Sequence, residues 1–388
     1  MSLVTAPPER VPYWRLSGFY LFYFASLGAL VPYWGLYLES LGYGPRAIGE
    51  LTAIFTATKV VAPNVWGWIA DHRGRRMAIV RLASALSAIA FAGVFVGTGY
   101  WWLALVLTVF SFFWNAALPQ IEATTFSHLG DGAHRYTHIR VWGSVGFILA
   151  VSGLGWMLDR HGAGMVPPVV LSLMVGIWAS TLIVPERAAG YVHLTHEPIS
   201  RVLRRPAVIG LLAASFLAQM SHGPYYAFYS IYLEDNGYSR SAIGELWALG
   251  VIAEVLLYLV MHRVLTRFGL RPLFLLAFAV TALRWVLIGL FVGHPLVLIA
   301  AQTLHAASFG VYHAVAIQFV HQFFVGRHQG RGQALYSSMS FGAGGAAGAL
   351  ASGYAWDVVG PTATYLAGAA TAVAGLVIVW RWVREPAR

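Results

Sequence analysis

The residues most able to do chemistry are charged side chains inside long apolar runs of the 388-residue chain. Lys59, its only lysine, lies in "FTATKVVAPNVWGWIA", and Glu254 lies in "GVIAEVLLY". A charge at the centre of a bilayer costs about 2.5 to 3.5 kcal/mol on insertion scales, so each one needs a partner or a purpose. An apolar setting favours the protonated form of a carboxylate, and an ammonium attracts anions. The pattern predicts proton and anion binding rather than bond-making.

Three roles are open for Lys59. Its ammonium could reach a membrane interface along its own stem, but it lies twelve residues after Ala47 and eleven before Ala70, which disfavours this role. It could form a static ion pair with Glu254. It could also attract an anionic substrate directly, or couple transport through a pair that forms and breaks. Glu254 is predicted to exchange a proton, with a permanently ionised bridge as its alternative.

Composition shows what must position these charges. Hydrophobic residues make up 58% of the chain and charged residues 10%, and the mean hydropathy is +0.66. These values indicate an integral membrane protein. Apolar stretches of about 20 residues predict twelve membrane-spanning helices. The predicted helices are 15–38, 47–70, 77–97, 101–125, 138–158, 166–185, 206–233, 241–264, 272–292, 295–323, 332–355 and 361–383.

An internal repeat divides the chain. "YLESLGYGPRAIGEL" (37–51) matches "YLEDNGYSRSAIGEL" (232–246) at ten of fifteen positions, with an offset of 195 residues. We therefore expect an all-α fold of two pseudo-symmetric six-helix bundles, 1–185 and 206–388, joined by a cytoplasmic linker, 186–205. A substrate site is expected between the bundles near the bilayer midplane. The same offset relates Lys59 to Glu254, so equivalent positions carry opposite charges.

The net charge of +10 does not predict a nucleic-acid partner, because no loop carries a dense basic patch. If both termini are cytoplasmic, that face collects 20 of the 25 basic residues, which is the positive-inside bias of a multi-pass inner (plasma) membrane protein. The first apolar run lacks the features of a cleaved signal peptide and is expected to remain. The chain has no cysteine, and we expect no metal site and no cofactor. Its expected partners are the lipid bilayer and a small molecule, with the monomer as the working unit.

A loop signature indicates a family. "GWIADHRGRR" (67–76) resembles the signature between helices two and three of the major facilitator superfamily. This resemblance implies a latch that the transport cycle breaks and remakes at the cytoplasmic face. Asp71 could accept hydrogen bonds from a helix N-terminus, and the arginines could bind phosphate headgroups. The latch residues it implies are Gly67, Asp71, Arg73, Gly74, Arg75 and Arg76.

Further stretches, among them "HIRVWGSVGF", "ALRWVLIG" and "TLHAASFGVYHA", resemble the phenylpropionate permease family, which is related to lactose permease and the nucleoside:proton symporters. The spacing of Glu122 and Arg140, with Asn115 seven residues before Glu122, resembles the lactose permease substrate pair. The alternative for this pair is a structural salt bridge. Arg284 and His305 resemble a polar pair of lactose permease.

The chain departs from lactose permease around His305. Ser308 stands where the proton-carrying glutamate is expected, and Gln302 stands where a lysine is expected. Proton coupling must therefore run through another group, and Glu254 and Glu122 are the candidates. His222 and Tyr225 are further candidate substrate contacts, and Tyr225 would suit an aromatic cargo. Helix-to-helix hydrogen bonding and packing are their alternatives.

These features predict a secondary transporter that works by alternating access, with a proton gradient as its driving force. Proton-coupled uptake of a small organic carboxylate, aromatic carboxylates included, is the preferred function. A sugar or nucleoside symporter, a proton-driven exporter and a non-transporting membrane sensor are the alternatives. An enzyme is not expected, because the metal-like spacing of His134 and His138 has only Asp131 nearby and lacks a general base.

Overall fold

The computed structural model describes residues 11–187, 199–326 and 328–385, without the side chains of Asp71, Arg73, Asp131, Ala133, His134 and Ile199. These residues form helices and no strand. The first-half helices are α1 (Tyr13–Ser40), α2 (Pro45–Arg73), α3 (Arg76–Phe91), η1 (Ala92–Phe95), α4 (Tyr100–Leu129), η2 (Gly130–Arg135), α5 (Tyr136–His161), η3 (Ala163–Met165) and α6 (Val166–Leu182). The predicted linker lies largely outside the described residues.

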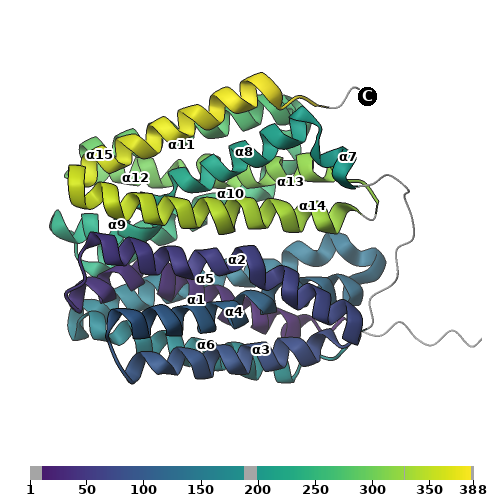
Figure 1. Cartoon of the computed structure of the whole chain (residues 1–388), viewed down its shortest axis with the longest axis horizontal. Coiled ribbons are helices and arrows are strands. Elements are labelled where there is room, and N and C mark those ends of the chain that lie inside the picture. Colours follow the sequence, from purple (N-terminus) through teal and green to yellow (C-terminus); the bar gives the residue numbers. More distant parts are fainter. Residues whose placement is uncertain (1–10, 188–198, 327, 386–388) are drawn as a thin grey trace, which may run out of the picture.

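The second half begins after the short helix α7 (Ile199–Leu203). Its helices are α8 (Pro206–Ser221), α9 (Gly223–Asp235), α10 (Arg240–Phe268), α11 (Leu270–Phe291), α12 (Pro295–Thr303), η4 (Ala306–Val311), α13 (Tyr312–Phe323), α14 (His328–Ser337), η5 (Ser338–Gly344) and α15 (Gly345–Trp382). Both η4 and η5 are π-helical. Figure 1 shows the two halves as two stacked layers of roughly parallel helices.

Nine helices in the described part of the chain are long and apolar enough to cross a membrane. Two further passes fall outside that set: α2, which carries Glu50 and Lys59, and the broken pair α8 and α9. One run among the nine, His328–Trp382, holds two passes, because it reverses at Gly360, as Figure 1 shows. The structure is therefore consistent with twelve passes, and the predicted all-helical membrane fold is confirmed.

The predicted helix 206–233 is wrong in one respect, because it is broken in the middle. α8 ends at Ser221 and α9 begins at Gly223, with His222 between them. Pro224 has no N–H to donate to the carbonyl four residues earlier, so a continuous α-helix loses a hydrogen bond there. A Cβ at Gly223 would lie 2.7 Å from the Gly348 Cα, so the break is also where α9 approaches α15 most closely.

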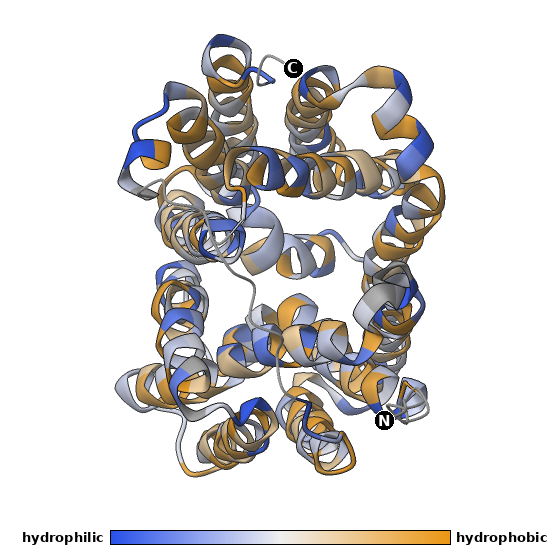
Figure 2. Ribbon diagram, turned by 90° about the vertical axis from the view of Figure 1, so that its right-hand side faces the viewer, coloured by the Kyte–Doolittle hydropathy of each residue, from blue (hydrophilic) through white to orange (hydrophobic). Residues whose placement is uncertain are grey.

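Apolar side chains cover the outside of the molecule. Trp101 is 82% exposed, Leu296 81% and Leu259 77%, values that a water-facing surface would not favour. Figure 2 looks along the helices and shows hydrophobic residues over much of their length, with hydrophilic stretches in several of the connecting turns. Lipid tails are the solvent that suits this surface.

The two halves meet along a surface that we call the seam. It is formed by α2 against α15 and by α5 against α10, and α1 also packs on α9. We call the end that holds loops 41–44 and 236–239 the distal end, and the end that holds the chain's C-terminus the proximal end (Figure 1). Small residues bring the backbones together: a Cβ at Gly49 would lie 2.7 Å from the Gly353 Cα.

We predict that Gly348→Ala destabilises the protein. A Cβ at Gly348 would lie 2.5 Å from the Met220 carbonyl oxygen, and such overpacking costs about 1–3 kcal/mol. Gly18→Ala is the control, because Gly18 also lies inside a helix but has nothing within 4 Å of an added Cβ. Thermal unfolding in detergent should give a lower midpoint for Gly348→Ala alone. Equal midpoints for the two variants would contradict the close packing of α8 and α15.

Candidate functional site

Arg284 on α11 is the most enclosed charged side chain in the described part of the chain, with 0% exposure. Its Nε donates to the Ala301 carbonyl at 3.0 Å, and its Nη2 donates to Gln302 Oε1 at 2.9 Å. Its Nη1 lies 3.1 Å from His305 Nδ1 and 3.4 Å from Ser308 Oγ. Gln302 and Ser308, which depart from the resembled pattern, therefore serve as acceptors for this guanidinium.

The contact with Arg284 sets the tautomer of His305. A guanidinium only donates hydrogen bonds, so Nδ1 of His305 must be the acceptor and the proton of the neutral ring lies on Nε2. That Nε2 lies 3.5 Å from Glu254 Oε2. A carboxylate thus stands beside the histidine after all, but α10 supplies it rather than the histidine's own helix. The side chain of Glu254 keeps 18% of its surface uncovered by protein.

The local backbone makes room for this contact. His305 directly precedes the π-helical segment η4, and π-turns within α-helices are frequent at functional sites. Gly310 lies within η4, and a Cβ there would lie 3.2 Å from Glu254 Cγ. Tyr258, one turn after Glu254, donates to the Gly310 carbonyl at 3.4 Å. The glycine thus lets α10 and its carboxylate approach η4.

His222 and Tyr225 lie in the same enclosed region. His222 is 0% exposed, and its Nδ1 lies 2.7 Å from the Ala218 carbonyl. Tyr225 is 1% exposed and donates to Gln302 Oε1 at 3.2 Å, while its ring lies 4.2 Å from the Arg284 guanidinium carbon. In this conformation His222, Tyr225 and Arg284 contact protein on all sides. Their predicted substrate contacts would require another conformation.

Lys59 does not pair with Glu254 in this structure. Its Nζ lies 5.6 Å from the Phe55 ring centroid, and no carboxylate of the described residues lies within ion-pair distance of it. Lys59 is partly buried at the seam, where a Cβ at Gly342 would lie 3.3 Å from the Lys59 carbonyl carbon. A static Lys59–Glu254 pair is therefore wrong for this conformation, because His305 occupies the place beside the carboxylate.

A short hydrogen-bonded chain lies beside Lys59. Asn115 Nδ2 donates to Thr58 Oγ1 at 2.9 Å, and Thr58 Oγ1 donates to Ser111 Oγ at 2.9 Å. Asn115 is 5% exposed, so this chain joins α4 to α2. Thr58 directly precedes Lys59, and the chain therefore holds the backbone that carries the ammonium. The sequence did not single out Thr58, although its position next to Lys59 was a signal.

Glu122 and Arg140 lie near one another without forming an ion pair between these two described side chains. Glu122 Oε1 instead accepts a hydrogen bond from Tyr136 at 3.1 Å. The Arg140 guanidinium carbon lies 3.7 Å from the Phe24 ring centroid. Tyr136 is four residues before Arg140 on α5, so helical spacing could have identified it. Glu122 and Arg140 are both only partly buried.

The helix that carries Arg140 packs across the seam. α5 packs against α10, the helix of Glu254 and Tyr258. The ring of His313 stacks on Phe309 with centroids 6.0 Å apart, and Phe309 stacks on His305 at 5.3 Å. Arg140 and Glu254 thus lie on two helices that pack against each other, and we treat the two groups of charges as one candidate site.

The latch residues lie where α2 ends and α3 begins. Gly74 ends α2 with φ 65°, a left-handed conformation that glycine adopts without strain, and Arg75 precedes α3. Gly67 has no atom closer than 3.9 Å to an added Cβ. The side chains of Asp71 and Arg73 lie outside the described part. Arg76 opens α3 and is partly buried, and the latch stays a prediction.

A different carboxylate occupies the start of α3. Glu186 Oε2 accepts the Met77 N–H at 2.9 Å, so it satisfies a helix N-terminus. In the second half, Glu385 Oε1 accepts the Leu270 N–H of α11 at 3.0 Å. In each half, a glutamate that follows the sixth pass thus accepts a backbone N–H at the start of the third pass, which is α3 in the first half and α11 in the second. The sequence reasoning missed both glutamates, although each one follows the last apolar residues of its half.

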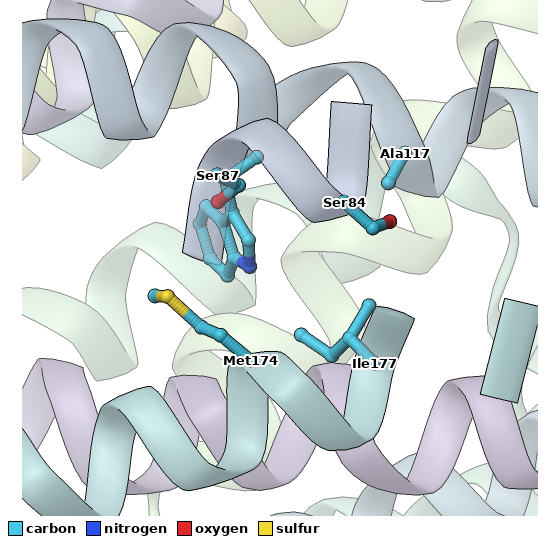
Figure 3. Close-up of a pocket in the computed structure, with 6 residues that line it drawn as sticks. Ser84, Ser87, Ala117, Met174 and Ile177 are labelled. Carbon is cyan, nitrogen blue, oxygen red and sulfur yellow. The ribbon is translucent and has the colours of Figure 1, made fainter. Parts of the chain in front are cut away.

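A small space inside the first half is a poor candidate for the site. Figure 3 shows it between α3, α4 and α6. Its lining carries no charged residue and consists of Ser84, Ser87, Trp114, Ala117, Met174 and Ile177. Ion binding requires charged or strongly polar groups, and these lie at the seam instead.

The chain is similar to known membrane proteins along most of its length. The model of the MFS_1 like family matches residues 13–367. The chain is 27% identical over 360 residues to a probable 3-phenylpropionic acid transporter of Escherichia coli (strain K12), covering 89% of this chain and 92% of that protein. It is also 27% identical over 378 residues to a maltose permease of Geobacillus stearothermophilus, covering 93% and 92%.

Among solved structures, a variant of the nucleoside transporter NupG is similar to this chain with a TM-score of 0.83. The sequence identity is 17%, and the match covers 95% of this chain and 98% of that one. At this identity the likeness concerns the fold alone. It agrees with the two-layer helical architecture described above.

We predict that Gln302→Ala destabilises the protein by about 1–3 kcal/mol, because it leaves Arg284 Nη2 and the Tyr225 hydroxyl without an acceptor. Gln302→Glu should leave the stability unchanged, because it keeps the acceptor oxygen, and the Gln302 Nε2 that it removes forms no hydrogen bond. Thr303→Ala is the neighbouring control, since Thr303 is exposed and bonds only to its own helix. Thermal unfolding in detergent tests this order. A Gln302→Ala midpoint equal to that of Thr303→Ala would show that the Arg284 cluster does not need this acceptor.

Proposed function

The chain belongs to the MFS_1 like family and is a membrane transporter of the major facilitator type, and we propose that it couples proton movement to the uptake of a small organic carboxylate. The observation that carries this proposal is the balance of charges at the seam. Two cations of the candidate site, Lys59 and Arg140, are partly uncovered and lack an ion pair among the described residues. Unpaired cations in a low-dielectric site attract an anion.

The pairing of the charges supports an anionic substrate. Acceptors enclose Arg284, and Glu254 lies beside His305, so Lys59 and Arg140 are the cations of the candidate site without an ion pair among the described residues. A monocarboxylate bound between Lys59 and Arg140 would offset part of their charge. Arg140 is suited to the contact, because a guanidinium can bind a carboxylate through two parallel hydrogen bonds while its face rests on Phe24.

Glu254 is the proposed proton carrier. His305 presents its Nε2–H to the carboxylate, and Arg284 opposes protonation of His305, because Nδ1 is already an acceptor and a second positive charge would lie nearby. A proton that reaches this cluster therefore binds Glu254. His305 and Arg284 act as positioning residues, which orient the ring toward the carboxylate.

Coupling follows from competition for the same cations. Ionised Glu254 attracts the cations of the opposite half and competes with an anionic substrate for them. Once Glu254 is protonated, the attraction is lost, and Lys59 and Arg140 can bind the substrate. The proton thus favours substrate binding through a difference in electrostatic energy between two states. Proton and anion then occupy the same state of the protein and cross the membrane together, which is symport.

The named relatives support a carboxylate with an aromatic group. A probable 3-phenylpropionic acid transporter covers most of the chain, and aromatic rings surround the candidate site, among them Phe24, Phe55 and Phe309. Ring contacts add about 0.5–1.5 kcal/mol beyond burial. We therefore propose an arylalkyl carboxylate as the substrate class.

A neutral polyol is the second candidate. The chain Ser111–Thr58–Asn115 places hydroxyl and amide groups beside Lys59, and a maltose permease is also similar along most of the chain. Uptake of labelled maltose and uridine beside 3-phenylpropionate separates the two classes.

The membrane orientation proposed from the basic residues places both termini in the cytoplasm of an inner membrane. Polar contacts in the described part of the chain join the halves at the distal end and, between Asn64 and Ser338, farther along the seam toward the proximal end. With the proposed orientation the distal end faces the outside, and it would open there in one state of the cycle.

Glu254→Gln should abolish accumulation of 3-phenylpropionate driven by a proton gradient in liposomes, and exchange of labelled for unlabelled substrate should remain. Glutamine keeps an acceptor for His305 but cannot exchange a proton. Glu245→Gln on the same helix is the matched control, because Glu245 is exposed and its side chain forms no hydrogen bond or ion pair with the described residues. Unchanged accumulation and pH dependence in Glu254→Gln would sink the proton assignment.

Lys59→Ala should weaken binding of 3-phenylpropionate about tenfold or more, the loss expected for one charge-assisted contact. Lys59→Arg should largely retain it, and the neutral amide of the same acid should bind both variants about equally. Titration calorimetry on the purified protein measures these affinities. Equal carboxylate affinity in Lys59→Ala and the unmodified protein would contradict the anion-attracting role.

A further inference from the structure

The first helical turn of α10 is capped by its own Ser239, which accepts the Ala242 N–H at 3.2 Å, and by a residue from the other half. Asp159, near the end of α5, accepts the Arg240 N–H on Oδ1 at 2.8 Å and the Ser241 N–H on Oδ2 at 3.0 Å. It also accepts the Ser241 hydroxyl. The first N–H groups of a helix have no partner within the helix, and a negative charge there is favourable. Thus a helix that belongs to the second half is completed by the first.

The repeat places a related carboxylate on the other side of the molecule. Asp357, in the pass related to α5, lies 198 residues after Asp159, and its Oδ2 is 2.7 Å from Arg46 Nε in the first turn of α2. The residue of α2 equivalent to Arg240 is Pro45, which has no N–H to donate. A backbone cap like that of Asp159 therefore cannot form there, and a side-chain ion pair replaces it.

Both contacts lie where the halves come closest at the distal end. A Cβ at Gly155 would lie 2.5 Å from the Arg240 carbonyl oxygen, and one at Gly353 would lie 2.8 Å from the Pro45 carbonyl oxygen. The Arg240 side chain adds a hydrogen bond to the Leu158 carbonyl at 3.1 Å. The distal end can therefore separate only if the contacts of Asp159 and Asp357 break.

The two contacts differ in strength. The side chains of Arg46 and Asp357 are 54% and 39% exposed, and exposed ion pairs between flexible side chains contribute little. Asp159 is exposed as well, but it holds two backbone N–H groups whose positions the helix fixes, so less side-chain freedom is lost per bond. The two sides of the distal end are thus closed by chemically different contacts, and on the α2 side a hydrogen bond from Tyr354 to Glu50 at 2.8 Å adds to the ion pair.

We propose that Asp159 is the main lock of the distal end and that the Arg46–Asp357 pair is its weaker, repeat-related counterpart. Breaking the Asp159 cap shifts the protein toward a state that is open at the distal end. The shift requires neither substrate nor a proton gradient, so it holds or fails independently of the proposed carboxylate symport.

The chain offers a direct test, because it contains no cysteine. Cysteines introduced at Leu41 and Asn236 would carry spin labels on exposed, repeat-related loop positions, one in each half. Pulsed electron resonance on the purified protein without substrate then measures the distance across the distal end. We expect Asp159→Ala to raise the ratio of the long to the short distance population about tenfold, the effect of losing a helix cap.

Three further variants make the test specific. Asp159→Asn keeps one side-chain oxygen that can accept an N–H of the first turn of α10. Its change in the ratio of the two distance populations should therefore be smaller than that of Asp159→Ala. Asp357→Asn should give a smaller shift than Asp159→Ala, and Glu245→Gln on α10 should give none. The unmodified distance distribution in both Asp159 variants would overturn the proposal. A shift in Glu245→Gln as large as that in Asp159→Ala would do the same, as would a larger shift in Asp357→Asn.

Discussion

A guanidinium that water cannot reach needs an acceptor for its N–H groups, and the second half of this transporter is arranged around that requirement. Arg284 has no exposed surface, and Gln302, His305, Ser308 and the Ala301 carbonyl surround it. Satisfying the guanidinium also directs the free N–H of His305 toward Glu254. A demand for hydrogen bonds inside a low-dielectric interior thus determines the geometry of the candidate site around Glu254.

The two halves share a repeat but use it for different chemistry. Glu50 and Glu245 occupy equivalent positions, yet Glu50 accepts hydrogen bonds from Tyr100 and Tyr354, whereas Glu245 is exposed. Lys59 and Glu254 are equivalent too, and only Glu254 has a charged or ionisable partner. In the described chain, π-helical segments occur only in the second half. The second half thus holds its ionisable residues in a hydrogen-bonded cluster. The first half leaves Lys59 and Arg140 without an ion pair among the described residues.

Much of the architecture could be predicted from the sequence. The apolar runs, the repeat and the loop signature predicted the passes, because hydrocarbon imposes the same length and apolar composition on each of them. The site was harder, since the sequence does not say which face of a helix meets which neighbour. Ser308 and Gln302 read as lost functional groups, whereas in three dimensions they are acceptors for Arg284. The repeat relates Lys59 to Glu254 and made an ion pair between them one of the open roles. In the structure Glu254 lies beside His305 instead.

The halves meet backbone to backbone at the distal end, through glycines such as Gly49, Gly155 and Gly353. Closure there depends on main-chain shape and on a few carboxylates, and side chains that face a substrate take no part in it. Substitutions at the candidate site that change the substrate preference can therefore accumulate without altering the contacts that close the distal end. Relatives whose names refer to an aromatic acid and to a disaccharide fit this division of labour.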